Sequence, residues 1–573
     1  MSSSEPRDPH DLQIDDMDEM LDADDIAEEI PEDDDHAMDS GDDGQQEMII
    51  QNDSIAYFDE CPHSLFSIAQ HPVHPSLIAV GGSAGRKKSD GGVGWVFDTS
   101  VIPPPPVLPA SYESDPAARE NTQLNSLVSI EGHSDTINAL AWTLPRGEFL
   151  VSGGYDGRLR AWKATVEPGS PFQMILFGEN EETTEINWIE PCPSPAYPNH
   201  IAVGTTTKPK KSSSKESDSE ESNPEEWDHL VWVYKIDPSN TNNPLEMVNC
   251  YVRNNGASTA GAWTHDGLLL ATVAQDSSLY VWDVWGEAAA KGLGAGKDRP
   301  LVALTSTNEK FYVEGGLLSI AMDPHGAWVA VGGGCSRDEK SKSGGGFIRI
   351  ISLPRFAARG KKASVKPKAG GEIIGSFAHS DEGIETLSVT IASVAPPMTL
   401  LAAGSNAGSI AVYDMTHYSQ RRLIPSAHDD YSVVKVEFIR NTWLLTSCGT
   451  DGVVRRWDLR GRGSAEKEWK GHRPLMEKKN YNADGEEKDG GGEEGGVMGF
   501  VHGETGEQVV TVGDDGLRTT GSLIRSRRSF NQKTDADDDA KQAKHIVHFV
   551  TVIACKCHKP LSLYTNVETS WLP

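Results

Sequence analysis

The sequence predicts an all-β fold in which eight small antiparallel sheets form a closed ring. Three observations lead to this prediction. A pattern of alternating strands recurs eight times from about residue 54, each copy carries polar turn residues between apolar strands, and each copy is too short to bury both faces of its own sheet. Such sheets are stable when neighbours pack against them radially, and a ring leaves only short strand edges exposed.

The clearest copy of the repeat spans residues 131–162 and reads EGHSDTINALAWTLPRGEFLVSGGYDGRLRAW. It opens with Gly132-His133, continues through two apolar strands, and reaches a third strand that ends at Trp162. Before that third strand, Asp156-Gly157 predicts a tight hairpin turn, because Asp-Gly between alternating strands is a strong turn signal. Gly-His and Trp-Asp pairs are how WD repeats are recognised, so the sequence predicts an eight-bladed WD-repeat β-propeller.

The other seven copies keep this order of features with local variation. They span residues 63–98, 185–237, 257–283, 314–353, 379–414, 428–458 and, in an eroded form, 471–523. A Trp near the end of the third strand is expected to pack between blades in five copies, as Trp95, Trp162, Trp232, Trp282 and Trp457. A His before the first strand is expected to make a structural hydrogen bond within its blade rather than to bind metal, as His63, His133, His379, His428 and His472.

Composition divides the chain into three parts. Residues 1–50 hold 20 carboxylates against one cation, Arg7, and are expected to form a disordered acidic tail that either solvates the protein or docks to a basic partner. The propeller is expected over residues 51–524, with low-complexity insertions near residues 205–228, 334–346, 355–371 and 477–496. Residues 525–573 are expected to lie outside it, as a C-terminal extension or as non-native sequence added by a gene-model error.

Ring closure is expected to involve residues 54–59, SIAYFD. This segment has strand character and precedes the first complete copy. The phase of the repeat therefore predicts that it supplies the outer strand of the last blade.

The net charge of -33 favours a basic protein partner over a nucleic-acid backbone, because binding to phosphates relies on Lys and Arg. The seven Cys residues are scattered, so we predict no disulfide framework and a reducing compartment. The first residues have no basic and apolar leader pattern, and no apolar run reaches the roughly 18 residues of a membrane helix. We therefore expect neither a signal peptide nor a membrane span.

The candidate binding residues are carboxylates at the entrance to the first strand of a repeat. The sequence predicts that they share one position in the repeat, and they are Asp135, Glu185, Glu314, Glu385 and Asp430. In a propeller these entrances open on one rim, so the carboxylates would ring the mouth of the central channel. Their combined field would suit an Arg- and Lys-rich peptide. The alternative for each residue is that it only satisfies backbone donors of its loop.

No enzyme or cofactor motif is present. The sequence has no G-x-x-x-x-G-K-[ST], no G-x-S-x-G and no H-E-x-x-H pattern. Cys555, Cys557 and His558 offer three soft ligands, but a structural zinc site normally needs four with characteristic spacings. We therefore expect no catalysis, no metal and no cofactor.

At this point the chain resembles a known family. Residues 52–72, NDSIAYFDECPHSLFSIAQHP, with the acidic tail before them, and the third copy with TEINWIEPCP and LVWVYKID, are similar to the fungal suppressor-of-QSR-truncations family of ribosome-assembly WD proteins. The animal relative is angio-associated migratory cell protein. The resemblance covers residues 50–520, and beyond Asp514-Asp515-Gly516 this sequence departs from the family pattern.

The resemblance implies a dedicated chaperone of one basic large-subunit ribosomal protein (yeast L-ten, universal L-sixteen), which enters the 60S subunit late, in the cytoplasm. It implies that the client's basic N-terminal segment binds the acidic top face of an eight-bladed propeller, on Asp135, Glu185 and Glu385, with Glu314 as a fourth. We expect a monomer that contacts neither nucleic acid nor membrane directly. The alternative function is a WD-repeat scaffold or substrate receptor in ubiquitin ligation or signalling.

Overall fold

A computed structural model of the chain describes the greater part of the predicted propeller. The described residues are 53–58, 61, 63–85, 90–102, 122–167, 169–181, 184–206, 231–252, 256–290, 292–293, 299–334, 345–355, 369–379, 383–460, 465, 467–477, 480–481, 487–488, 493–503, 506, 508–514 and 550–554. The predicted acidic tail, most of the predicted insertions and most of residues 525–573 lie outside these ranges.

Eight sheets of four or five strands follow one another along the described chain. Their first strands are β2 (Leu65–Gln70), β7 (Ile137–Trp142), β11 (Ile186–Pro191), β15 (Ser258–Trp263), β19 (Leu317–Met322), β23 (Ile384–Val394), β27 (Val433–Phe438) and β35 (Val497–His502). The second strands are β3 (Leu77–Ser83), β8 (Phe149–Gly154), β12 (His200–Thr205), β16 (Leu269–Ala274), β20 (Trp328–Gly334), β24 (Pro397–Ser405), β28 (Leu444–Gly449) and β36 (Gln508–Gly513).

The outer half of each sheet consists of a third and a fourth strand. The third strands are β4 (Gly92–Asp98), β9 (Leu159–Thr165), β13 (Val231–Ile236), β17 (Ser278–Asp283), β21 (Gly346–Ser352), β25 (Ile410–Asp414), β29 (Val453–Asp458) and β37 (Val550–Ala554). The fourth strands are β6 (Val128–His133), β10 (Gln173–Asn180), β14 (Leu245–Tyr251), β18 (Val302–Leu304), β22 (Ile373–Ala378), β26 (Ser419–Ile424), β30 (Lys467–Lys470) and β1 (Ala56–Phe58).

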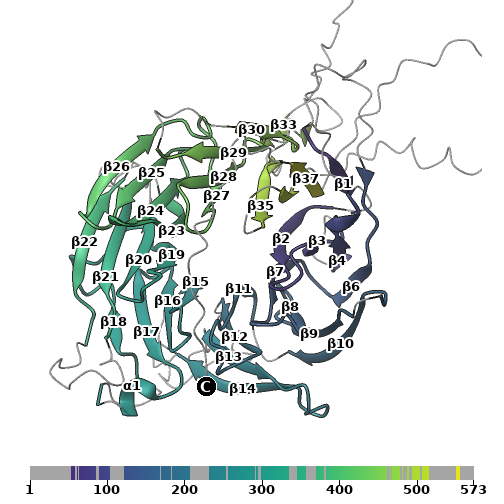
Figure 1. Ribbon diagram of the computed structural model, residues 1–573, viewed down its shortest axis with the longest axis horizontal. Coiled ribbons are helices and arrows are strands. Elements are labelled where there is room, and N and C mark those ends of the chain that lie inside the picture. Colours follow the sequence, from purple (N-terminus) through teal and green to yellow (C-terminus); the bar gives the residue numbers. More distant parts are fainter. Residues whose placement is uncertain are drawn as a thin grey trace, which may run out of the picture. The chain divides into compact units, whose positions relative to one another are not determined.

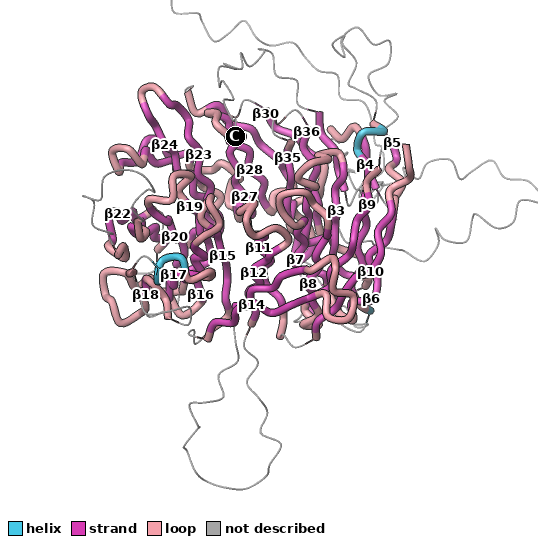
Figure 2. The backbone as a smooth tube through the Cα atoms, turned by 60° about the horizontal axis from the view of Figure 1, so that its bottom comes forward, coloured by secondary structure: helices cyan, strands magenta, loops and turns pink. Residues whose placement is uncertain are grey.

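A few short elements accompany the sheets. β5 (Thr122–Gln123) pairs in parallel with β1, and β31 (Met476–Glu477), β32 (Asn480–Tyr481), β33 (Glu487–Lys488) and β34 (Glu493–Glu494) form two two-stranded pairs. The helical segments of the described chain are α1 (Glu287–Ala290) and the 3-10 helix η2 (Thr99–Val101), drawn in cyan among the strands in Figure 2. No helix among the described residues is long and apolar enough to cross a membrane.

The eight first strands contact one another in a closed cycle, which places them around a common centre (Figure 1). Neighbouring first strands run parallel. Val436 N–H donates to Thr386 Oγ1 at 3.2 Å, and Phe438 N–H donates to Ser388 Oγ at 3.1 Å. Since both residue numbers rise by two from one bond to the next, β23 and β27 run in the same direction. All first strands therefore begin at one rim, here called the start rim, and end at the other, the end rim. The predicted all-β propeller fold is confirmed.

The core between sheets contains the predicted tryptophans. Trp95, Trp162, Trp232, Trp282 and Trp457 are all buried. Trp232 of the third sheet packs in one cluster with Phe149 and Val151 of the second sheet, which confirms the expected contact between blades. Because each sheet buries apolar side chains against the next, the closed ring, and not the single sheet, is the stable unit.

The chain closes the ring with strands from both ends of the described region. β1 is the fourth strand of the eighth sheet, and Ala56 pairs with Val552 of β37. This confirms the prediction for residues 54–59. The predicted boundary at residue 524 is wrong, because β37 is the third strand of that same sheet. The connection from β36 to β37 is far longer than an ordinary hairpin loop. The spacing of strands in the other repeats therefore does not predict where β37 lies in the sequence.

Candidate functional site

One backbone hydrogen bond recurs in all eight sheets and fixes the register of the start rim. An N–H at or just after the end of the second strand donates to the carbonyl of the residue immediately before the first strand, at 3.0–3.2 Å. The donor and acceptor pairs are Ser83 and Ser64, Tyr155 and Thr136, Thr206 and Glu185, Gln275 and Ala257, Gly334 and Gly316, Asn406 and Gly383, Thr450 and Ser432, and Asp514 and Gly496. The turn after the second strand and the segment entering the first strand therefore lie side by side.

The five predicted carboxylates all lie at the start rim, but at four different positions. Glu185 immediately precedes its first strand, Asp135 lies two residues before, Glu314 and Asp430 lie three residues before, and Glu385 is the second residue of β23. The prediction that they share one phase is therefore wrong. The segments that enter the first strands differ in length. Asp135 and Asp430 each follow a repeat histidine by two residues, yet Asp135 lies two residues and Asp430 three residues before its strand.

Glu385 occupies a position at which three other blades carry hydrogen-bond donors and four carry apolar side chains. It is the extra residue of the β-bulge at the start of β23. At the same bulge, Asn138 Nδ2 donates to Ile186 O at 3.2 Å, Asn187 Nδ2 donates to Ser258 O at 3.0 Å, and Thr259 Oγ1 donates to Leu317 O at 2.7 Å. Each of these bonds joins one blade to the next. An ionised carboxylate only accepts hydrogen bonds, so Glu385 cannot make this structural contact.

Asp135 serves its own loop and keeps further capacity to accept. Its Oδ1 accepts the Thr136 N–H at 2.7 Å, which agrees with the alternative that such residues satisfy loop donors. A carboxylate has about four lone-pair positions, so this bond leaves most of them available. Asp135, Glu385 and Asp430 form no ion pair with any residue in the described ranges.

Tyr155 is a rim residue that the sequence argument missed. It begins the turn between β8 and β9, its N–H is held by Thr136 O at 3.0 Å, and 37% of its surface is exposed. Burial of part of the ring raises the pKa of the Tyr155 hydroxyl, and the charges of Glu185 and Asp135 raise it further. Carboxylates from two adjacent blades therefore act on one aromatic side chain. The signal in the sequence was a large aromatic residue placed directly before the Asp-Gly turn.

Cations near Tyr155 are already paired with carboxylates of the outer strand. Arg158 contacts Glu179 at 3.2 Å and Glu181 at 2.7 Å, and Arg160 contacts Glu179 at 3.0 Å. These pairs engage both arginines, and Asp135 forms no ion pair with a described residue. The start rim in this region therefore presents two carboxylates beside an exposed aromatic ring, an arrangement that favours a cation.

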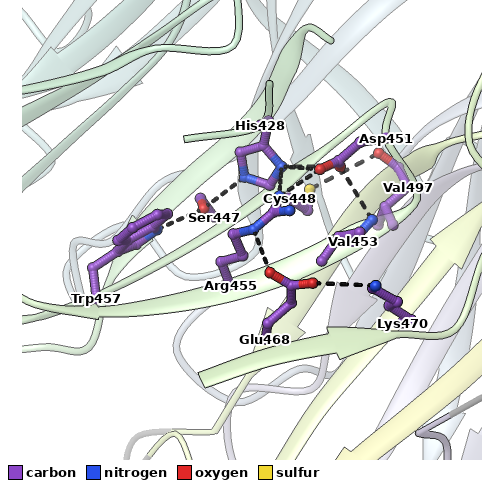
Figure 3. Close-up of polar contacts among 10 residues, drawn as sticks. All are labelled: His428, Ser447, Cys448, Asp451, Val453, Arg455, Trp457, Glu468, Lys470 and Val497. Atoms are coloured by element: carbon purple, nitrogen blue, oxygen red, sulfur yellow. Dashed lines mark hydrogen bonds and ion pairs between the residues drawn. The ribbon is translucent and has the colours of Figure 1, made fainter. Parts of the chain in front are cut away.

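Four of the five recurrent histidines, His133, His379, His428 and His472, have the structural role predicted for them. His428 Nδ1 donates to Asp451 Oδ1 at 2.9 Å, its Nε2 accepts from Ser447 Oγ at 2.8 Å, and Trp457 Nε1 donates to that hydroxyl oxygen at 2.9 Å (Figure 3). The second blade repeats this network with His133, Asp156, Ser152 and Trp162. Shorter versions join His379 to Ser409 and His472 to Thr511.

A metal site is not apparent in the region that the structure covers. No group of three or more His, Cys, Asp or Glu residues in the described ranges is placed to hold a metal ion. Cys555, Cys557 and His558 lie outside those ranges.

The ring of sheets and its His-Asp-Ser-Trp networks define a WD-repeat propeller. The family model described as WD domain, G-beta repeat, matches residues 124–163. The chain belongs to the Sqt1 family: it is 42% identical to Chaetomium thermophilum Sqt1 over 81% of this chain and 96% of that one, with a TM-score of 0.63. This confirms the resemblance to the suppressor-of-QSR-truncations family.

Two further comparisons extend this result. Chaetomium thermophilum Sqt1 bound to the N-terminus of the ribosomal protein L10 is also 42% identical, with 81% of this chain and 98% of that chain covered and a TM-score of 0.63. Saccharomyces cerevisiae Sqt1 is 18% identical, with 81% and 97% covered and a TM-score of 0.53, and that likeness shows the fold alone. No curated protein matches the sequence.

Proposed function

We propose that this chain is a chaperone that binds the basic N-terminal segment of ribosomal protein L10 at the start rim. Chaetomium thermophilum Sqt1, its relative at 42% identity, has a structure with the N-terminus of that ribosomal protein bound. By holding the segment, the chain would support late incorporation of the client into the 60S subunit, in the cytoplasm. The proposed function is binding as a monomer, with no catalytic step and no cofactor.

The observation that carries this proposal is the placement of Glu385. A position that holds hydrogen-bond donors in three other blades, and apolar side chains in the remaining four, is occupied here by a carboxylate that forms no ion pair with a described residue. Such a substitution brings no evident structural benefit, so we attribute it to ligand binding. A Lys or Arg of the client would supply the missing positive charge through a charge-assisted hydrogen bond.

The second support is the charge of the whole protein. With a net charge of -33, the chain attracts a basic segment over a distance and repels acidic partners. Around Tyr155, the carboxylates of Asp135 and Glu185 would hold a guanidinium group while the ring provides a cation–π surface. Glu314 and Asp430 extend the same rim toward the fifth and seventh blades.

The direct test is a charge reversal at Glu385. A synthetic peptide with the sequence of the L10 N-terminus should bind the full chain, and Glu385→Lys should weaken that binding by at least about thirtyfold, because truncating one member of a desolvated charge pair costs about 2–5 kcal/mol. Isothermal titration calorimetry provides the dissociation constants, and circular dichroism shows whether the variant is folded.

The matched control reverses a carboxylate on an outer strand. Glu246 lies on β14, with 57% of its side chain exposed. Glu246→Lys changes the net charge by the same amount but should leave peptide affinity within about twofold. Equal losses for both variants would mean that only net charge matters, and no loss at Glu385→Lys would remove this residue from the site.

A further inference from the structure

The hairpin that joins β23 and β24 is longer than the corresponding hairpin of every other blade (Figure 2). β23 has 11 residues and β24 has 9, whereas the first and second strands of the other seven blades have 6 or 7. The pairing begins at the start rim with the same bulge as in the other blades and continues to Val394 and Pro397. The extra pairs therefore lie at the end rim and carry the tip of the hairpin away from it.

The tip of this hairpin is apolar and exposed. Val394 is 83% exposed, the highest value among the large hydrophobic residues of the described chain, and Ala395, Pro396 and Pro397 are also exposed. The seven other blades complete the ring with shorter hairpins, so closure of the propeller does not require this extension. Four successive exposed apolar residues at the tip of a paired hairpin are typical of a contact with another molecule.

Arg421 and Trp443 continue the surface from the base of the hairpin. Arg421 Nη1 lies 3.8 Å from Met398 Sδ, and the Arg421 guanidinium carbon lies 4.9 Å from the centre of the Trp443 ring. Met398 and Trp443 are both partly buried against one core cluster of the sixth and seventh blades. The cation–π contact holds the guanidinium group in one place, while the side chain as a whole remains exposed. The hairpin and Trp443 therefore form one surface across two blades, with Arg421 between them.

A β-bulge directs two successive arginines toward the seventh blade. Arg421 is the extra residue between Gln420 and Arg422 in the pairing of β26 with β25. In a regular strand, successive side chains point to opposite faces of the sheet. At this bulge both side chains reach the same neighbour, because Arg421 contacts Trp443 and Arg422 Nη1 donates to Asp458 O at 3.3 Å. The bulge thus places two guanidinium groups beside the end rim of the seventh blade.

This part of the end rim carries more cations than carboxylates. Arg460 Nε and Nη2 donate to the two oxygens of Asp458 at 2.9 and 2.7 Å, whereas Arg421 and Arg440 form no ion pair with a described residue. Arg440 is exposed and lies in the turn between β27 and β28, as Trp443 does. Among the described residues of 413–422, 437–445 and 457–467, with His417 counted as neutral, the cations are Arg421, Arg422, Arg440, Arg460 and Lys467, and the carboxylates are Asp414, Glu437 and Asp458. This local excess of positive charge, in a chain of net charge -33, favours an acidic partner.

We propose that an acidic segment of a partner polypeptide binds the hairpin surface, which consists of residues 394–398, Arg421, Arg440 and Trp443. Carboxylates of the segment would pair with Arg421 and Arg440 through charge-assisted hydrogen bonds. An apolar side chain of the segment would pack against the hairpin tip and remove it from water. Arg, Trp and Met, which this surface combines, are the residue types enriched in protein interfaces.

A polypeptide fits this surface better than other polyanions do. The sugar-phosphate backbone of RNA would pair with the arginines but would leave Val394 and the two prolines in water. A membrane is disfavoured because the tip lacks the Trp, Phe and Leu side chains that anchor proteins to lipid. The hairpin surface lies at the end rim and the proposed L10 site at the start rim, so the two partners do not compete.

The test presents full-length protein to phage-displayed random twelve-residue peptides, with parallel selection on the original protein and on Arg421→Glu. Peptides enriched only on the original protein should combine at least two Asp or Glu residues with an aliphatic or aromatic residue. Their consensus peptide, labelled with fluorescein, is then titrated by fluorescence anisotropy. Its dissociation constant should rise at least about tenfold in Arg421→Glu and in Val394→Asp. Absence of Arg421-dependent peptides, Arg421-dependent peptides without carboxylates, or unchanged affinity in Val394→Asp would overturn the proposal.

Matched controls carry the same substitutions in end-rim turns of other blades. The Arg146 side chain, 80% exposed, lies in the turn between β7 and β8, and Val73, 53% exposed, lies in the turn between β2 and β3. Arg146→Glu and Val73→Asp should leave the affinity for the consensus peptide within about twofold. All four substituted residues are exposed, so each variant should fold, which circular dichroism checks. Losses as large in the controls would show a general effect of charge and overturn the proposal.

Two further probes distinguish a polypeptide from the other polyanions. A fluorescein-labelled twelve-nucleotide oligouridylate and vesicles of phosphatidylcholine and phosphatidylserine are titrated with the same variants. Both should bind more weakly than the consensus peptide. Tighter binding of either probe, lost in Arg421→Glu, would overturn the assignment to a polypeptide in favour of RNA or a membrane.

Discussion

His428 Nδ1 lies 2.9 Å from Asp451 Oδ1, with the histidine side chain fully buried and the aspartate side chain 6% exposed. Arg455 also contacts Asp451 and extends the network outward to Glu468 at 3.0 Å. Burial alone would raise the pKa of Asp451, but the hydrogen bonds from His428 and Arg455 outweigh it, so the pKa is lowered. The carboxylate is therefore charged at neutral pH and serves as the centre of the seventh blade's polar network.

Asp451→Ala should destabilise the protein by about 3 kcal/mol, because it leaves the buried His428 N–H without its acceptor and Arg455 paired with Glu468 alone. Urea unfolding followed by tryptophan fluorescence measures this loss. Asp458→Ala is the control: Asp458 pairs with the exposed Arg460, and such surface pairs contribute about 1 kcal/mol or less. Similar losses in both variants would contradict the central role of Asp451.

Because β37 closes the ring, the stability of the protein should be sensitive to a backbone change at Val552. This residue pairs with Val510 on one side and Ala56 on the other, so a proline there removes an N–H from a strand with neighbours on both edges. Val552→Pro should cost about 3 kcal/mol or more. Val552→Ala keeps the N–H and should cost clearly less. A proline variant as stable as the original protein would mean that β37 does not close the ring.

The sequence predicted the strands that are marked by patterns of residues close together in the chain. Each first, second and third strand of the clear copies has an alternating or apolar pattern, and the buried Trp282 and Trp457 follow from the repeat. β37 was missed because a long connection separates it from β36. Repeat phase could not reveal that Glu385 lies in a β-bulge, because the extra residue of a bulge is defined by pairing with the second strand.

The sequence predicted on which rim of the propeller the site lies, but not which side chains are neighbours there. That Asp135 and Glu185 act together on Tyr155 depends on how the second and third blades meet. The contacts of Arg421 with Trp443 and of Arg422 with Asp458 likewise join two sheets. No spacing along the chain encodes such relationships, because they arise from packing between repeats.

Tyr155 is predicted to contribute to peptide binding through its ring and not its hydroxyl. Tyr155→Ala should weaken binding of the L10 N-terminal peptide by roughly two- to tenfold, in line with a cation–π contribution of about 0.5–1 kcal/mol at an exposed site and more when desolvated. Tyr155→Phe should retain most of the affinity. Tyr418 is similarly exposed and lies on the turn between β25 and β26, so Tyr418→Ala is a matched control without effect. Loss of affinity in Tyr155→Phe would instead assign the contribution to the hydroxyl.

Peptide binding at the start rim is predicted to weaken as salt is added. The Debye length falls from about 10 Å at 0.1 M salt to about 3 Å at 1 M, which screens the field of the carboxylates. The dissociation constant should therefore rise steadily with sodium chloride, mainly through a slower association rate. In Glu385→Gln the dependence should be shallower, because one charge is missing from the rim. A salt-independent affinity would contradict an electrostatic mode of binding.

The raised pKa of Glu190, at the end rim, predicts that the stability of the folded protein depends on pH. The strands around it raise its pKa from the ordinary 4.5 to about 7 by desolvation, despite the opposing charge of Lys435 and the exposure of its side chain. The folded protein thus binds this proton more tightly than the unfolded chain, and the stability from Glu190 is lost as pH rises from about 4.5 to about 7. Glu190→Gln, which carries no charge, should therefore be more stable relative to the original protein at pH 8 than at pH 5. Urea unfolding at both pH values gives the comparison, with Glu246→Gln as control, and an equal difference at the two values would show that the pKa of Glu190 is not raised.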